Sequence, residues 1–209
     1  MQEGKFWDKA ADGYAKRPIK DMAAYDQTMD RTRHYLSADQ NALEIGCGTG
    51  STALLLAKHV RHITASDVSA RMIEIGRGKA ADQGVENIGF LRATPFDGTL
   101  ENGAYDVVLA FNLLHLMQGL PEVIRRVGEL LAPGGLFVSK TVCLGEKKNY
   151  LRVPITLMKA FGFAPYVNFL KIRDLEQAMT DANFQILETG NYPASLPSRF
   201  IVAKKMELH

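Results

Sequence analysis

Hydrophobic and polar residues alternate with two different periods along the chain, and the period changes repeatedly after residue 41. Short runs rich in apolar and β-branched residues predict strands, and longer stretches with an apolar residue every three or four positions predict helices. Strand-like runs lie at 42–45, 62–66, 88–91, 105–111 and 136–142, with helical stretches between them at 51–59, 69–82 and 120–131. This repeated order predicts right-handed crossovers and a doubly wound, mostly parallel α/β sheet.

Both ends of the chain depart from this repeated order of strands and helices. Two helical stretches, at about 4–15 and 21–36, precede the first strand. Near the other end, a helix around 172–181 precedes candidate strands at 184–189 and 199–203. We expect these two strands to form an antiparallel hairpin at the edge of a sheet of about seven strands.

The segment after the fifth strand, residues 144–170, is rich in Leu, Met, Phe and Tyr and is broken by Pro154 and Pro165. This composition predicts a helical insertion over the ligand crevice that such a sheet forms at the carboxyl ends of its strands. We therefore expect one domain, 1–209, in four parts. These are a helical preface (1–40), a ligand-binding core (41–143), the helical insertion (144–170) and a closing helix with edge strands (171–209).

Composition narrows the function without specifying it. The chain has 209 residues, 46% of them hydrophobic, and a formal net charge of +2 without dense Lys/Arg runs, so a nucleic-acid partner is disfavoured. The start of the chain carries charges where a signal peptide needs an apolar core, and no apolar run approaches about 18 residues. Cys47 and Cys143 lie far apart with no metal-ligand spacing, so we expect a cytoplasmic protein with no metal site and no stable membrane insertion.

Three glycines, Gly46, Gly48 and Gly50, follow the first predicted strand in the run ALEIGCGTG. Glycines at the carboxyl end of such a strand let a ligand approach the backbone, which indicates a nucleotide-like ligand. Ser51 stands where the GxGxxG fingerprint of NAD proteins needs its third glycine. Asp67 ends the second strand about 20 residues later, where a carboxylate can accept hydrogen bonds from ribose hydroxyls.

These residues resemble motif I and the ribose-binding acid of the class I S-adenosylmethionine-dependent methyltransferases. The run YDVVLAFNLLHL (105–116) is similar to the fourth-strand motif of that family, and LLAPGGLFV (130–138) to the segment leading into its fifth strand. The matching pieces occur in family order over residues 41–142. The resemblance implies a Rossmann-like fold, S-adenosylmethionine as cofactor and S-adenosylhomocysteine as product.

The resemblance also implies roles for individual residues in binding the cofactor. Glu44 is expected to order the glycine loop and the methionine amino group, and Asp67 to hold the ribose. Many members carry an Asp where Thr94 stands, so here a hydroxyl or backbone contact must replace it. The cofactor-binding residues expected on this basis are Glu44, Gly46, Cys47, Gly48, Gly50, Asp67, Val68, Met72, Ala93, Thr94, Phe111 and Asn112.

Catalytic residues are harder to infer, because transfer from a sulfonium needs alignment and water exclusion more than a fixed set of groups. His115 follows the fourth strand, and a near-neutral pKa would suit a general base. A histidine that fills or caps the following helix is the alternative. Tyr14 resembles a tyrosine that many small-molecule members place over the cofactor, although a simple packing role is equally compatible with the sequence.

The acceptor is the least determined part of the function. The apolar stretch 150–163 suits the wall of a pocket for an aromatic or lipid-like acceptor, and the layout is similar to ubiquinone and menaquinone methyltransferases. The function expected first is methyl transfer from S-adenosylmethionine to a small, partly apolar acceptor by in-line displacement. Three alternatives stay open: a protein or lipid acceptor, a cofactor-binding protein without activity, and an NAD(P)-dependent oxidoreductase in which Arg71 faces a 2′-phosphate. The sequence does not decide between a monomer and a homodimer.

Overall fold

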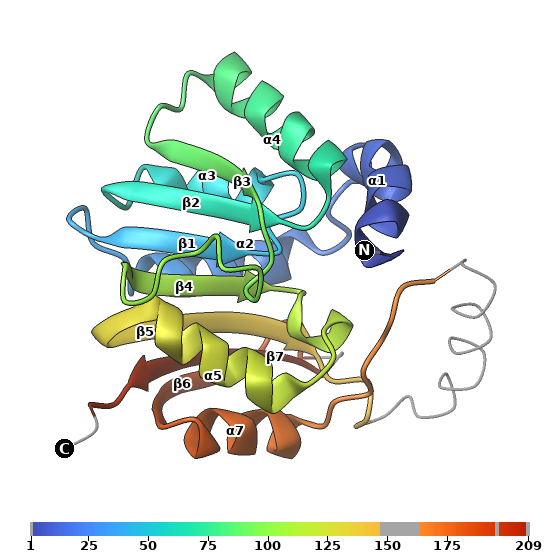
Figure 1. Ribbon diagram of the computed structural model, residues 1–209. Helices are drawn as coiled ribbons and strands as arrows, with labels where there is room; N and C mark the ends of the chain where they lie inside the picture. Colours follow the sequence, from blue (N-terminus) through green and yellow to red (C-terminus); the bar gives the residue numbers. More distant parts are fainter. Residues whose placement is uncertain (1, 147–163, 195–196, 208–209) are drawn as a thin grey trace.

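Seven strands form one sheet within residues 2–146, 164–194 and 197–207, which are the residues that the computed structural model describes (Figure 1). The strands are β1 (Asn41–Ile45), β2 (His62–Asp67), β3 (Ile88–Arg92), β4 (Tyr105–Phe111), β5 (Leu131–Val142), β6 (Phe184–Asn191) and β7 (Ser198–Lys205). The helices are α1 (Gln2–Ala15), α2 (Met22–Arg33), α3 (Ser51–Ala57), α4 (Ala70–Gln83), α5 (Leu120–Leu130) and α7 (Ile172–Asp181), with a 3₁₀ turn η1 (Leu114–Leu116).

The strand order is β3-β2-β1-β4-β5-β7-β6, and β1 to β5 are parallel. This confirms the predicted doubly wound α/β fold. The order reverses between β1 and β4, so the connections on either side of this pair diverge at the carboxyl ends of the strands. In such sheets ligands bind in the crevice at that point.

Strand β4 shows why the sheet is covered on both faces. Val107 and Leu109 pack with the cluster that includes α2 and α3, while Val108 and Ala110 pack on the opposite side with α5 and α7. In a strand, successive side chains point to opposite faces, so a continuous apolar run can only be buried between two layers of helices. In Figure 1, α5 and α7 lie in front of the sheet and α2 and α3 lie behind it.

The last two strands confirm the predicted antiparallel hairpin at the edge of the sheet. Strand β7 lies between β5 and β6, so β6 is the outermost strand of the hairpin. The burial pattern gives the reason. Residues 200–203 of β7 are all buried, as in an interior strand, whereas β6 alternates between covered and more exposed side chains.

Two further predictions concern helices. The insertion expected at 144–170 falls mostly on residues 147–163, which lie outside the described residues, and residues 164–170 form no helix or strand. Among the helices of the described part of the chain, none has the length and apolarity needed to cross a membrane.

Candidate active site

A cavity of about 460 Å³ opens at the carboxyl ends of the strands, where the strand order reverses. Eleven of the fourteen residues expected from the sequence line it, namely Tyr14, Gly46, Gly48, Asp67, Val68, Met72, Ala93, Thr94, Phe111, Asn112 and His115. Eight other residues complete the lining: Trp7, Pro95, Leu113, Leu116, Met117, Val142, Pro165 and Tyr166. The cavity therefore combines the ends of β1 to β5 with helix α1.

The three glycines lie in the loop after β1 with positive φ values, and their surroundings differ. A Cβ at Gly46 would lie 2.5 Å from Cδ1 of Leu113, and one at Gly50 would lie 2.5 Å from Cε1 of Phe90. A Cβ at Gly48 would meet only the Tyr14 ring, at 3.7 Å, and would point into the cavity. Gly50 does not line the cavity, so packing on Phe90 explains it, and contact with a cofactor stays a prediction there.

The carboxylate of Asp67, at the end of β2, is held by two backbone N–H groups, one in the glycine loop and one just after β2. Its Oδ2 accepts a hydrogen bond from Gly48 N (3.0 Å), and its Oδ1 accepts one from Ser69 N (2.9 Å). Burial raises the pKa of this carboxyl group, although these N–H groups favour its ionised form. The carboxylate is thus fixed in orientation before any ligand binds.

Glu44 lies behind the glycine loop and is not part of the cavity lining. Its side chain is only 2% exposed, and burial, together with the charge of Asp67, raises its pKa to about 8. Its Oε2 has no hydrogen-bond partner within the described residues. A buried carboxyl oxygen without a partner is costly unless it is protonated or meets a cationic group.

His115 sits in η1 after β4 and lines the cavity as predicted, but its expected near-neutral pKa is wrong. Burial lowers the pKa of this imidazole to about 4, so the ring is neutral at physiological pH. Its backbone oxygen accepts a hydrogen bond from Asn168 N (2.7 Å), while Nδ1 has no partner among the residues that the structure describes. His115 is therefore suited to accept a hydrogen bond from a ligand.

Tyr14 reaches the cavity from α1 and lies over Gly48, with 46% of its surface exposed. Partial burial and the negative charges of Glu44 and Asp67 raise the pKa of its hydroxyl, so it stays protonated and can donate a hydrogen bond. Trp7, seven residues earlier on the same helix, also lines the cavity. Residues seven apart share a helix face, so this spacing is the signal by which Trp7 could have been found.

Val68 and Met72 line the cavity after β2, and Ala93 and Thr94 line it from the loop after β3. The carboxylate nearest in sequence to Thr94 is Asp97, which accepts a hydrogen bond from Thr94 N (2.6 Å) and is not part of the lining.

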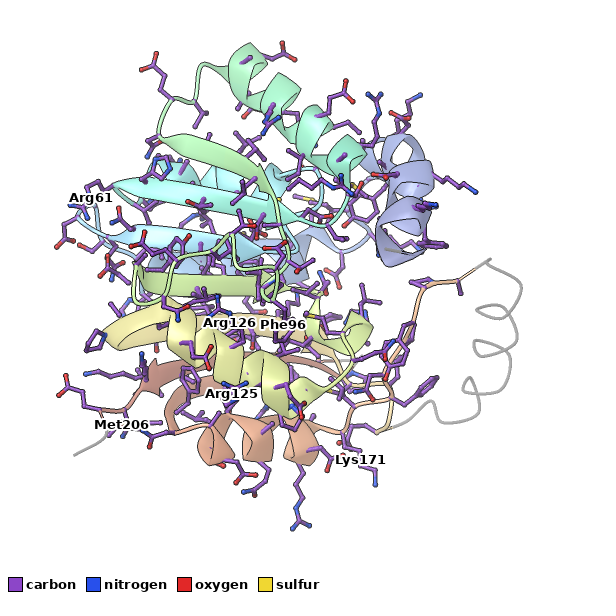
Figure 2. The ribbon with its side chains drawn as sticks, viewed as in Figure 1. Arg61, Phe96, Arg125, Arg126, Lys171 and Met206 are labelled. Atoms are coloured by element: carbon purple, nitrogen blue, oxygen red, sulfur yellow. The ribbon has the colours of Figure 1, made fainter. Side chains whose placement is uncertain are left out.

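The loop after β3 is anchored from α5 by Arg126. Its Nε donates to the oxygen of Pro95 (2.6 Å) and its Nη2 to that of Leu100 (3.1 Å). Figure 2 labels Arg126 together with Phe96, which follows Pro95 in this loop. Arg126 does not reach the cavity itself, but it fixes the loop that carries Thr94 and Pro95 into it.

Other predicted contacts are placed away from the cavity. Cys47 is buried outside the lining, and burial raises the pKa of its thiol well above the ordinary value, which fits a packing role. The guanidinium of Arg71 contacts Asp12 and Glu74 (2.7 Å each) and does not face the cavity. No group of three or more His, Cys, Asp or Glu side chains suited to a metal ion occurs in the described ranges.

Comparison with known proteins agrees with this geometry. Residues 15–189 match the family described as a methyltransferase domain. The ubiquinone biosynthesis O-methyltransferase of Rickettsia canadensis (strain McKiel) is 28% identical over 163 residues, which are 75% of this chain and 68% of that protein. The uncharacterized methyltransferase YcgJ of Bacillus subtilis (strain 168) is 27% identical over 101 residues, or 48% of this chain and 40% of that one.

Among solved structures, the geranyl diphosphate C-methyltransferase of Streptomyces coelicolor A3(2) has a similar fold. It was crystallised with Mg²⁺, geranyl diphosphate and S-adenosyl-L-homocysteine. The two chains superpose with a TM-score of 0.76 over 98% of this chain and 97% of the other. With 13% sequence identity, this similarity concerns the fold.

Proposed function

The chain belongs to the methyltransferase domain family and is an S-adenosylmethionine-dependent methyltransferase, and we propose that the cavity at the carboxyl ends of its strands is the active site. The observation that carries this assignment is the pairing of Asp67 with the glycine loop. A fixed carboxylate bonded to Gly48 N lies beside a glycine loop whose Gly46 and Gly48 line the cavity without side chains. Ribose hydroxyls need such an acceptor, and a bulky sulfonium ligand needs such an opening.

The residues of the cavity fit this cofactor. Asp67 would hold the ribose, and Val68, Met72, Ala93 and Thr94 would enclose the adenine. The unpartnered Oε2 of Glu44 suits a nearby cationic group, and we assign it to ordering the loop and the methionine ammonium. Gly46, Gly48, Phe111 and Asn112 would face the remainder of the methionine moiety.

The other half of the cavity supports a small, partly apolar acceptor. Trp7, Leu116, Met117, Val142, Pro165 and Tyr166 supply aromatic and aliphatic surface. When bound, S-adenosylmethionine supplies a methyl group that its sulfonium sulfur has already activated. The apolar walls exclude water, neutral His115 accepts a hydrogen bond from the acceptor, and Tyr14 donates one.

The rival oxidoreductase function loses its main support. Arg71 is engaged by Asp12 and Glu74, and Ser51 accepts a hydrogen bond from Lys79 Nζ (2.9 Å) instead of providing a third glycine. A lipid or protein acceptor remains the second candidate, because the named relatives act in ubiquinone biosynthesis and on geranyl diphosphate. A cytoplasmic location and the absence of a nucleic-acid partner stay predictions from the sequence.

Calorimetry tests the cofactor directly. S-Adenosylhomocysteine should bind at micromolar concentrations and NADH should not. Asp67→Ala should weaken S-adenosylhomocysteine binding by about 1–3 kcal/mol, since the backbone and ribose donors lose their acceptor. Unchanged affinity would remove Asp67 from the site. The acceptor is then sought by incubating the enzyme with isotope-labelled S-adenosylmethionine and panels of phenols, isoprenoids, lipids and proteins.

A further inference from the structure

Helix α1 reaches the cavity from outside the sheet and packs beside the start of α4 (Figure 1). Gly4 of α1 lies against Val68, where a Cβ would be 3.3 Å from the Val68 oxygen, and Ala11 is fully buried. Trp7 and Tyr14 extend from this helix into the cavity. The position of α1 therefore decides how completely these two rings close the site.

One carboxylate of α1 connects the helix to the cofactor region. Asp8 Oδ1 accepts hydrogen bonds from Ser69 Oγ (2.6 Å) and from Arg71 N (3.1 Å). The backbone N–H of Ser69 in turn donates to Asp67 Oδ1 (2.9 Å). The contacts with Ser69 and Arg71 lower the pKa of Asp8, so the group is ionised at neutral pH. A continuous path of hydrogen bonds thus runs from α1 through Ser69 to Asp67.

We propose that Asp8 is a positioning residue that holds α1 over the bound cofactor and couples the placement of Trp7 and Tyr14 to occupancy of Asp67. The coupling to Asp67 rests on the proposed function, since it assumes that Asp67 binds the cofactor. If α1 is released, only a fraction of the molecules have the closed cavity, and the apparent cofactor affinity falls by that fraction. By linkage, a bound cofactor should also hold α1 more firmly.

The chain offers a matched set of variants and an internal probe. Trp7 is the single tryptophan in the sequence, so its fluorescence reports on α1 alone. We would compare Asp8→Ala and Asp8→Asn with Asp12→Asn, which removes a carboxylate one turn later that pairs with Arg71 on the surface. Acrylamide quenching is measured on the ligand-free full chain, and S-adenosylhomocysteine affinity by calorimetry.

Asp8→Ala should make Trp7 more accessible to acrylamide and raise the dissociation constant for S-adenosylhomocysteine about tenfold. Asp8→Asn should recover part of both losses, because its amide oxygen can still accept from Ser69 Oγ. Asp12→Asn should behave like the wild type. Circular dichroism establishes whether each variant is folded. If Asp8→Ala does not fold, Asp8→Asn decides whether Asp8 holds α1.

Wild-type quenching and affinity in the Asp8 variants would overturn the proposal. So would equal losses in Asp8→Ala and Asp12→Asn, because any charge on α1 would then have the same effect. If the wild type does not bind S-adenosylhomocysteine, the proposed function fails. The quenching comparison in ligand-free protein still decides whether Asp8 holds α1.

Discussion

Glu44 offers a quantitative test of how the site is built. It is a buried carboxyl group behind the glycine loop, with one oxygen unpartnered in the described part of the chain. Glu44→Gln keeps the shape of the side chain and removes the ability to ionise. We expect this change to stabilise the protein at neutral pH and to weaken cofactor binding at the same time.

The magnitude follows from the pKa of Glu44, which rises from an ordinary 4.5 to about 8 in the folded protein. Between these values the folded state binds more protons than the unfolded state, so the free energy of unfolding falls as pH rises. The slope approaches about 1.4 kcal/mol per pH unit, and the accumulated cost is about 3 kcal/mol at pH 7. A buried amide without full partners costs about 1 kcal/mol, which leaves a net gain of about 2 kcal/mol for Glu44→Gln.

Urea denaturation followed by circular dichroism at pH 5.5, 6.5 and 7.5 measures this difference. The stability of Glu44→Gln relative to the wild type should increase by about 1 kcal/mol with each step, because all other titrating groups are shared. A difference that does not change with pH would refute the argument, since Glu44 would then be ionised or protonated equally in both states. Calorimetry with S-adenosylhomocysteine at pH 7 measures the expected loss of affinity.

Three further predictions follow from other contacts. Gly50→Ala should lower the free energy of unfolding by about 2 kcal/mol or more, because its Cβ would collide with Phe90 at a positive φ. Gly48→Ala should destabilise the protein less and mainly weaken S-adenosylhomocysteine binding, so urea denaturation and calorimetry distinguish the two variants. Arg126→Ala should loosen the loop after β3 and cost about 1–3 kcal/mol of stability, seen as faster amide hydrogen exchange there. His115→Phe should lower turnover, and wild-type activity should show no titration of His115 between pH 6 and 8, because its pKa is about 4; a rate that rises through pH 6.5 would contradict this.

The pattern of apolar residues was sufficient to predict most of the fold. Period-two and period-3.6 segments are local properties, so the strands and helices between 41 and 142 follow from them. The antiparallel hairpin at the sheet edge was predicted as well, and the unbroken apolar run at 200–203 marks β7 as its inner strand. The class I methyltransferase resemblance is confirmed by the family match.

The site was predictable where sequence spacing determines position, and less so where tertiary packing does. Residues that follow parallel strands, such as Asp67 and His115, reach the same sheet edge by topology alone. The pKa of His115 depends on how many apolar neighbours enclose it, and the role of Gly50 depends on a ring from β3. Both depend on residues distant in sequence, so the local sequence could not predict either of them.

The interior position of β7 has a consequence for synthesis of the chain. The ribosome completes β5 and β6 before residues 198–205 emerge, and during that interval each strand lacks the neighbour that β7 provides. Unpaired apolar strands promote association with other chains. We therefore expect variants that delay the insertion of β7 to aggregate during expression even when the finished enzyme is stable.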